Sequence, residues 1–418
     1  MAPIEVMKRM RSTSFNTARG VFLNIFIACA FLGTIVLGVH APKTLTSRIW
    51  LLSDWMINYQ GGFIRRGLPG EVLYLISHTL HISLIPLIVA SYLFFFCVLF
   101  FAVWRLAIGS SRNFWVIAIV MSPAFLSFQL LHPQAGYRKE IIFLAALALF
   151  ALLHRNKKLS SGQSTAYMVA IAVIGTLSHE ATFLYLPYFV PVLLLSGCGY
   201  ANTFKQVAPA CIAGLLVFAV CAHYPGNQAA VSVMCQSLGY SLNAAGVNQV
   251  CGSGAIHYLL NTREFARQET LEAIARLHYF RVYPLLALIA ALPLIGISVH
   301  SWLRGFRRET TIIWASFAVA FICSLILFIY GIDWGRWIYI HIASLSILLL
   351  FLDCLITDSH QNQMAETIQP GRTTQIFAVT LLVIYATTWA LPNNIDETTN
   401  FGYVGRALAA VHKKTHPS

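Results

Sequence analysis

The sequence predicts an all-α protein that crosses a membrane many times, with about eleven helical spans and a cytoplasmic N-terminus. Of its 418 residues, 58% are hydrophobic and only 10% are charged, whereas soluble globular domains carry roughly 25% charged residues. Apolar stretches long enough to cross a bilayer as helices recur from one end of the chain to the other. We therefore expect a single integral membrane domain over residues 1–418.

The expected spans follow from apolar length. The first apolar run comes after a basic segment, as in a secretory signal, but it exceeds the roughly 7–15 apolar residues of a signal core, so it predicts an anchor. Only residues 178–180 separate the fifth span from the sixth, which leaves a re-entrant hairpin open as an alternative. The expected spans are 21–40, 84–105, 114–131, 140–154, 165–178, 181–197, 207–223, 282–302, 310–330, 337–355 and 374–391.

Basic residues in short loops predict the orientation. The 28 Lys and Arg divide equally between the two sides, so the prediction depends on tight basic turns such as 155–158 and 304–308. These turns lie on the side of the N-terminus, which we therefore expect in the cytoplasm. Residues 41–83 then form a first outer loop with an interfacial helix, and residues 224–281 form a large outer loop.

Two cysteines, Cys235 and Cys251, lie in the large outer loop. An oxidising compartment on that side would allow a disulfide between them. The sequence leaves open whether the two are joined.

Composition and missing motifs exclude several classes of function. The formal net charge of +13 suits contact with anionic membrane lipids or phosphate, and we find no nucleic-acid-binding module. A Walker-type loop, a dinucleotide glycine motif and a Gly-x-Ser-x-Gly elbow are all missing from the sequence. No Asp-x-Asp pair occurs either, which argues against a metal-bound nucleotide-sugar donor on the cytoplasmic face. We expect no cofactor and name no metal ligand, and the sequence leaves metal dependence open.

The richest polar segment, residues 54–71, follows the first expected span. Its Arg65 and Arg66 offer paired guanidinium groups of the kind that bind phosphate through two hydrogen bonds each. Tyr59 and neighbouring aromatic residues offer flat faces for sugar rings, and four glycines permit a close approach of the backbone. The segment predicts a site for a phosphorylated, ring-bearing ligand. An interfacial helix whose arginines contact lipid headgroups is the alternative.

A second ionisable cluster, Arg138, Lys139 and Glu140, falls on the same predicted face. Its two cations are suited to a diphosphate, with Glu140 orienting one of them. Long basic side chains that extend from a span end toward water are the alternative. Ionisable residues at membrane depth cost roughly 2.5–3.5 kcal/mol each on insertion scales, so their gathering on one face favours a function.

Two more clusters complete this face. His179 and Glu180 place a carboxyl group beside an imidazole, a pair that can act as general base or acid, although capping of a helix is the competing explanation. Asp333 and Arg336 stand among tryptophans. They either bind a sugar phosphate or pair with each other to close a turn.

These clusters together carry a resemblance. The run from Asn58 to Leu68, with the three clusters that follow it, resembles bacterial inner-membrane proteins of surface-polysaccharide assembly. In general design the chain is similar to oligosaccharide-repeat polymerases and to multi-span glycosyltransferases that use polyprenyl-linked sugars. Metal-dependent members of the latter group have a paired acidic motif in the first outer loop, where this chain has the single residues Asp54 and Glu71.

The resemblance implies a multi-pass protein of a bacterial inner membrane that transfers glycosyl groups at the outer face. The substrate would be a polyprenyl-(di)phosphate-linked saccharide, and the reaction would polymerise repeat units of a surface polysaccharide. We expect the basic residues to hold the phosphates, Asp54 or Glu180 to deprotonate the acceptor with help from His179, and the remaining residues to complete the pocket. The expected binding residues are Tyr59, Arg65, Arg66, Arg138, Lys139, Glu140, Asp333 and Arg336.

Two other classes of function remain open. A transporter or flippase for an anionic or lipid-linked solute also places ionisable residues within the membrane, although such sites lie near the midplane and these clusters gather at one face. A non-catalytic partner of other polysaccharide-assembly proteins would use the clusters as interfaces.

Overall fold

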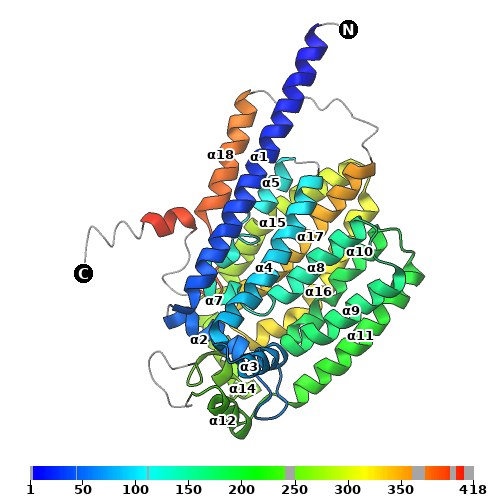
Figure 1. Ribbon diagram of the computed structural model, residues 1–418. Coiled ribbons are helices and arrows are strands. Elements are labelled where there is room, and N and C mark those ends of the chain that lie inside the picture. The colour runs from blue at the N-terminus through cyan, green and yellow to red at the C-terminus, as the bar shows by residue number, and fades with distance from the viewer. Residues whose placement is uncertain are drawn as a thin grey trace.

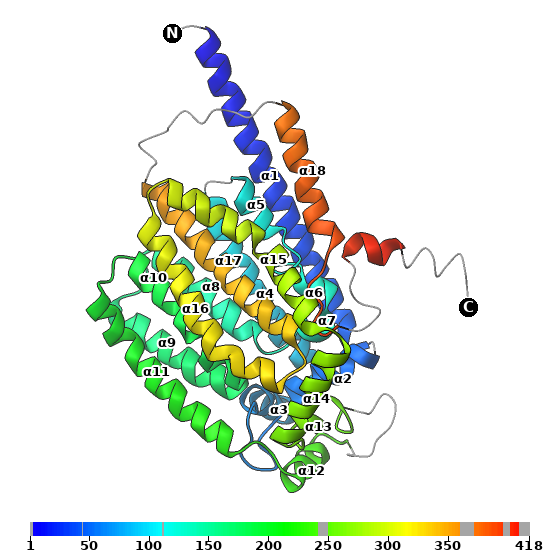
Figure 2. The same cartoon turned by 180° about the vertical axis from the view of Figure 1, so that it is seen from behind.

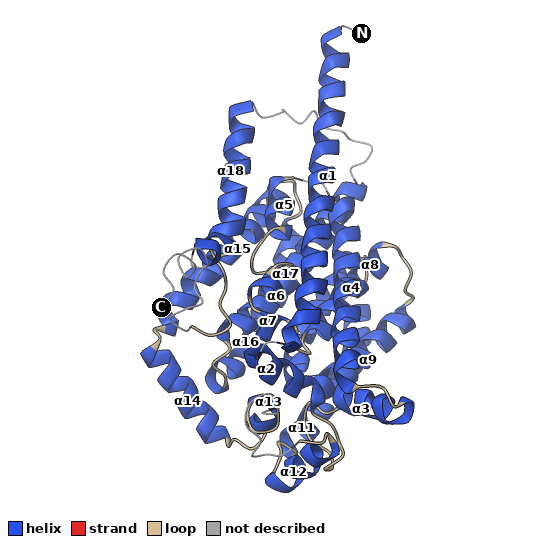
Figure 3. Ribbon diagram, turned by 60° about the vertical axis from the view of Figure 1, so that its left-hand side comes forward, coloured by secondary structure: helices blue, strands red, loops and turns tan. Residues whose placement is uncertain are grey.

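The computed structural model describes residues 3–43, 45–110, 113–240, 250–359, 372–395 and 402–408. Within these ranges the chain forms helices joined by loops and turns, and no strand (Figure 3). Six of the described helices are long and apolar enough to cross a membrane. The prediction of an all-α membrane protein with several spanning helices is therefore confirmed.

The six long apolar helices correspond to expected spans. Shorter apolar helices are α8 (Ile141–Arg155), the segment Glu180–Leu195 and the end of α18 (Arg372–Thr388). The six spans lie in α1 (Pro3–His40), α4 (Leu84–Gly109), α11 (Tyr200–His223), α15 (Tyr279–Leu303), α16 (Arg307–Tyr330) and α17 (Trp334–Ser359).

The expected span 114–131 is not a continuous helix. It contains α5 (Phe114–Val120), a series of turns, and α6 (Phe128–Leu131), followed by α7 (Pro133–Gly136). Pro123 lies in those turns, and proline removes a helical hydrogen bond and clashes with the preceding turn. Apolar length alone therefore overestimated the helix.

The segment between the fifth and sixth expected spans also departs from regular helix. After α9 (Ser161–Ser178), His179 adopts an extended backbone with φ of −157°. A 3-10 helix, η2 (Glu180–Tyr188), then leads into α10 (Phe189–Leu195). This nine-residue 3-10 helix is unusually long, because such helices rarely exceed three or four residues.

Helix α17 forms the centre of the molecule (Figures 1 and 2). It packs against α4, α8, α15 and α16, and 89% of its most apolar window is buried, compared with 22% for α11. The peripheral helices therefore present their apolar faces outward, as lipid-facing helices do. A polar residue on α17 instead meets other protein groups.

The polar segments gather at one end of the molecule. The opposite end is marked by the projecting ends of α1 and α18 (Figures 1 and 2). The gathered helices are α2 (Leu45–Met56), α3 (Leu68–Leu80), α12 (Gln228–Ser237), α13 (Gly254–Tyr258) and α14 (Arg263–Arg276).

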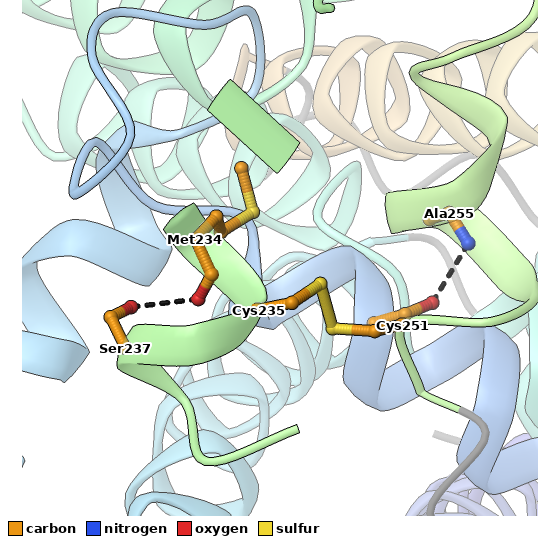
Figure 4. The surroundings of a disulfide bond; sticks show 6 residues. Met234, Cys235, Ser237, Cys251 and Ala255 are labelled. Carbon is orange, nitrogen blue, oxygen red and sulfur yellow. Dashed lines mark hydrogen bonds between the residues drawn. A yellow bond between two sulfur atoms is a disulfide. The ribbon is translucent and has the colours of Figure 1, made fainter. Parts of the chain in front are cut away.

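A disulfide holds part of this end together. Cys235 at the end of α12 is bonded to Cys251, just before α13 (Figure 4), and both cysteines are buried. The backbone N–H of Ala255 donates to the hydroxyl of Ser53, 2.8 Å away, so the cross-linked segment packs against α2. Residues 241–249 of the expected outer loop lie outside the described part of the chain.

Candidate functional site

The predicted site residues form one ionic cluster at this end of the molecule. They come from α2, the loop after it, the segment before α8, the start of η2 and the start of α17. Salt bridges and hydrogen bonds link them into two groups, and the backbone N–H of Lys139 joins the groups by donating to Oδ2 of Asp54 at 3.5 Å. The cluster consists of Asp54, Arg65, Arg66, Arg138, Lys139, Glu140, His179, Glu180, Asp333 and Arg336.

The outer part of the cluster consists of Arg65, Arg66, Lys139 and Glu180. The guanidinium groups of both arginines bind the carboxylate of Glu180. Arg66 donates to both oxygens of Glu180, from Nε to Oε2 at 2.8 Å and from Nη2 to Oε1 at 2.6 Å. Arg65 adds a third hydrogen bond, from Nη1 to Oε1 at 3.1 Å. The side chains of Arg65, Arg66 and Glu180 are between 15% and 25% exposed, so water reaches this part.

The loop between α2 and α3, which carries Arg65 and Arg66, has a left-handed non-glycine residue and a close contact that requires glycine. Arg66 has φ of +66°, a left-handed conformation that non-glycine residues adopt at a cost and that is frequent at functional sites. A Cβ on Gly67 would lie 2.1 Å from the ring of Tyr59, so glycine is required at this close approach. Arg65 is held by its backbone N–H, which donates to Tyr224 O at 3.1 Å.

The inner part of the cluster consists of Asp54, Arg138, Glu140, His179, Asp333 and Arg336. Asp333 contacts both arginines of this part. Its Oδ2 lies 2.7 Å from Nη2 of Arg336 and 3.4 Å from Nη1 of Arg138, while its Oδ1 accepts from Nδ2 of Asn393 at 2.7 Å. Arg138 also faces Asp54, with 3.8 Å between Nε and Oδ2. Arg138 thus lies between two aspartates, and Arg336 pairs with one of them.

Glu140 and His179 lie on the other side of Arg336. Oε1 of Glu140 is 3.2 Å from Nη1 of Arg336 and 3.3 Å from Nε2 of His179. Nδ1 of His179 accepts from the N–H of Ala181, which places the imidazole proton on Nε2, toward Glu140. The contacts of Glu140 with Arg336 and His179 are ion pairs by distance, and neither carboxylate oxygen of Glu140 has a hydrogen-bond partner among the described residues.

The inner part is far less accessible than the outer part. Apart from Asp333, its side chains are between 0% and 6% exposed. Arg336 also stacks over Trp337, with its guanidinium carbon 4.3 Å from the ring centroid, and Arg138 lies over Trp50 at 5.7 Å. Aromatic faces stabilise these buried cations.

Burial and neighbouring charges together set the protonation states of Asp54 and Lys139. Burial acts to raise the pKa of Asp54, but Arg138 and Lys139 outweigh it and hold that pKa at about 2. Burial lowers the pKa of Lys139 to about 8, against the attraction of Asp54. Nζ of Lys139 donates to the carbonyl of Arg66 at 2.6 Å. At neutral pH both groups are therefore charged.

The two parts differ in charge. The outer part, with Arg65, Arg66 and Lys139 against Glu180, is positive, and the inner part has three carboxylates against two arginines. An anionic group is therefore attracted to the outer part. A neutral, hydroxyl-bearing group is better suited to the inner part.

Tyr59 lies at the edge of the outer part. Its ring stacks on Phe63 with 5.2 Å between centroids, and its hydroxyl has no hydrogen-bond partner among the described residues. Glu71 accepts from the N–H of Tyr59 and the side chain of Gln60. Glu71 thus holds the loop and does not pair with the arginines.

Sequence reasoning missed Asn393. It lies after α18, where its side chain donates to Asp333 and its carbonyl accepts from the N–H of Gly335. A Cβ on Gly335 would lie 1.6 Å from Pro392 O, so glycine allows this contact. The one available signal was a polar residue just beyond the last expected span, on the same predicted face.

No group of three or more His, Cys, Asp or Glu in the described residues is arranged to hold a metal ion. The carboxylates of the cluster are bound to arginines instead.

Comparison with known proteins gives one match. The model of the family described as "Uncharacterised membrane protein Rv1490" matches residues 22–268, a range that contains the cluster residues up to Glu180 but not Asp333 or Arg336. No curated protein and no solved structure matches the chain. Because the family match covers more than half of the 418 residues, the protein belongs to the membrane protein family Rv1490.

Proposed function

We propose that this protein transfers glycosyl groups from a polyprenyl-(di)phosphate-linked saccharide at the membrane face that carries the ionic cluster, and that it polymerises repeat units of a surface polysaccharide. The observation that carries the proposal is the cluster itself: ten ionisable side chains from separate segments, positive in its outer part and buried in its inner part. Burying charged side chains costs free energy, and proteins retain such charges where they serve a substrate.

The phosphate of the substrate would bind in the outer part. Arg65 and Arg66 present several N–H donors within one fork, and Lys139 adds a charge beneath it. During transfer the bond between the anomeric carbon and the phosphate oxygen breaks, and negative charge grows on the leaving phosphate. Fixed cations aimed at that charge stabilise the transition state.

The acceptor hydroxyl would lie against the inner part. Glu140, whose two carboxylate oxygens have no hydrogen-bond partner among the described residues, would receive the proton as the acceptor oxygen bonds to the anomeric carbon. Nε2 of His179, 3.3 Å from Oε1, would orient this carboxylate. Oδ1 of Asp54 likewise has no hydrogen-bond partner among the described residues, and Oδ2 faces Arg138, so Asp54 is a second candidate for this base. Glu180 is engaged by both arginines, so it is not a free base in this state.

We further propose that the chain crosses a bacterial inner membrane about eleven times, with its N-terminus in the cytoplasm. The disulfide between Cys235 and Cys251 supports this orientation, because disulfides persist in oxidising compartments. It lies at the same end as the cluster, which would therefore face away from the cytoplasm. A lipid-linked saccharide would enter laterally from the bilayer.

A second candidate is transport of an anionic or lipid-linked solute. One observation favours it: His341, deep in α17, is buried between the hydroxyls of Tyr188 and Ser324, 2.6 and 2.8 Å from its ring nitrogens. Polar groups at this depth occur along solute and proton pathways. Both ring nitrogens are nevertheless satisfied, as in a structural contact between helices.

The test is the polysaccharide profile of a deletion strain, together with its lipid-linked intermediates. The strain is complemented with wild type, Asp54→Asn or Arg65→Ala at matched expression. We expect long chains to disappear and lipid-linked single repeats to accumulate, with rescue by wild type alone. Arg155→Ala, at the opposite end of the molecule, is the matched control and should rescue.

An unchanged polysaccharide in the deletion strain would contradict the proposal. Loss of polysaccharide without accumulation of lipid-linked repeats on the outer face, and with their retention on the cytoplasmic face, would favour the transporter.

A further inference from the structure

We infer that Glu180 occupies the position of the substrate phosphate, so that a diphosphate group must displace this carboxylate from Arg65 and Arg66 in order to bind. This inference rests on the proposed function and adds to it an internal counter-ion that competes with the substrate. It predicts that removing the negative charge of Glu180 strengthens phosphate binding, whereas loss of a general base would leave that binding unchanged.

The hydrogen bonds of Glu180 are those that a phosphate would accept. Both carboxylate oxygens accept from Arg66, at 2.6 and 2.8 Å, and one accepts from Arg65 at 3.1 Å. Two oxygens facing the fork of a guanidinium are the shared geometry of carboxylate and phosphate recognition. A diphosphate offers more oxygens and more charge than one carboxylate, so it can replace every one of these bonds.

Accessibility and charge also favour exchange at this pair rather than at the inner pairs. The side chains of Arg65, Arg66 and Glu180 are between 15% and 25% exposed, whereas Arg336 and Glu140 are 3% and 6% exposed. With Glu180 in place the outer part still carries excess positive charge, because Arg65, Arg66 and Lys139 outnumber this one carboxylate. Lys139 lies close to the fork, since its Nζ donates to the carbonyl of Arg66. Displacement of Glu180 leaves three cations for the incoming anion.

The segment that bears Glu180 is built to let this residue move. Glu180 is the first residue of η2 and follows the extended residue His179, so regular helix is interrupted on its N-terminal side. The far end of η2 is fixed, because Ser316 donates to Pro187 O and Tyr188 contacts His341. Glu180 can therefore leave the fork while the rest of η2 stays packed.

Displacement would also change the chemistry of the site. The three hydrogen bonds that hold Glu180 to the loop would be lost, and its carboxylate would be released beside His179. A carboxylate freed only when substrate is bound adds a proton acceptor at that moment. Phosphate binding would thus supply a further proton acceptor for the transfer step.

The experiment measures binding of inorganic pyrophosphate to the full-length protein in detergent, by calorimetry at low ionic strength. We expect wild type to bind and Glu180→Gln to bind about tenfold more tightly, which corresponds to about 1.4 kcal/mol. Glu264→Gln is the matched control: this exposed carboxylate lies on α14 and pairs with Arg267, so the variant loses the same charge away from the fork, and its affinity should equal that of wild type.

A second variant keeps the test decisive if Glu180→Gln folds poorly. Arg66→Gln should abolish binding, and pyrophosphate should raise the melting temperature of Glu180→Gln by more than that of wild type. Equal or weaker binding by Glu180→Gln overturns the inference but leaves a phosphate site in place. Absence of binding by every variant, wild type included, overturns the inference together with the phosphate recognition on which the proposed function depends.

Discussion

The two ends of the molecule differ in how many charged side chains they pair and in how deeply these are buried. At the end with α2, α12 and α14, ten ionisable side chains form one cluster, most of it buried. At the other end Arg155 pairs with Asp358 at 3.2 Å, with 16% and 46% of the two side chains exposed. The exposed pair closes the contact between two helix ends and requires no other explanation. The buried cluster requires one.

The difference separates an ion pair that needs no functional explanation from a cluster that stability alone does not explain. Exposed ion pairs contribute about 0–1 kcal/mol and are screened by salt. Buried ion pairs are often no more stable than apolar residues of the same volume, so stability alone does not account for the cluster. Its concentration at one end, split into a positive outer part and an acidic inner part, fits the substrate that we propose, which has an anionic and a hydroxyl-bearing portion.

The largest effect should follow removal of Arg336. Arg336→Ala leaves Asp333 and Glu140 without their closest guanidinium, and breaking a buried pair on one side costs about 3–5 kcal/mol. We expect a large fall in melting temperature and in the yield of folded protein, measured by fluorescence-detected size exclusion after heating. Arg336→Lys keeps the charge and should recover part of the loss. A melting temperature equal to that of wild type would show that the inner part is not a coupled unit.

The disulfide should have the next largest effect. Its cysteines are 16 residues apart, and closing a loop of that length contributes about 3 kcal/mol. Cys235→Ala should lower the melting temperature, and reduced wild type should match the variant. In cells both cysteines should resist maleimide labelling until a reductant is added. Free thiols in untreated cells would contradict the orientation in which this end faces away from the cytoplasm.

Anion binding should depend on pH through Lys139. Its pKa is about 8, lowered by burial and by Arg66 and Arg138 against the attraction of Asp54 and Glu140. Lys139 is thus cationic below pH 8 and neutral above it, so pyrophosphate affinity should fall as pH rises from 7 to 9. Lys139→Arg stays charged and should bind without this decline. An identical decline in both proteins would assign the titration to another group.

The smallest effect should come from the exposed pair. Arg155→Ala removes the bonds to Asp358 and one to the carbonyl of Arg105, and we expect the free energy of unfolding to change by about 1 kcal/mol or less. Polysaccharide synthesis should be unaffected. If this variant lost as much stability as Arg336→Ala, burial would not be what separates the two ends.

Sequence reasoning found the membrane class, because apolar length is a local property, and it predicted that the ionisable clusters share one face. It identified Arg65, Arg66, Arg138, Asp333 and Arg336 from residue type alone, and the structure places them in contact. It did not find how they pair. Which carboxylate meets which guanidinium depends on how α2, η2 and α17 pack, and one sequence does not contain that information.

The same limit explains the two helical errors. The span 114–131 was expected because its residues are apolar, but Pro123 interrupts it. The 3-10 helix after His179 has no local signal beyond a run of apolar residues. Asn393 reaches Asp333 only because Gly335 permits close packing of a segment that lies far along the chain.

The most direct test of the account is transfer by the purified protein. Lipid-linked saccharides extracted from the deletion strain are mixed with the full-length protein in vesicles, and glycan length is measured by mass spectrometry. The account predicts longer lipid-linked glycans with wild type, release of polyprenyl diphosphate in equal amount, and neither with Arg66→Gln. Vesicles in which folded wild type leaves the saccharides at their original length, while moving them across the bilayer, would contradict it.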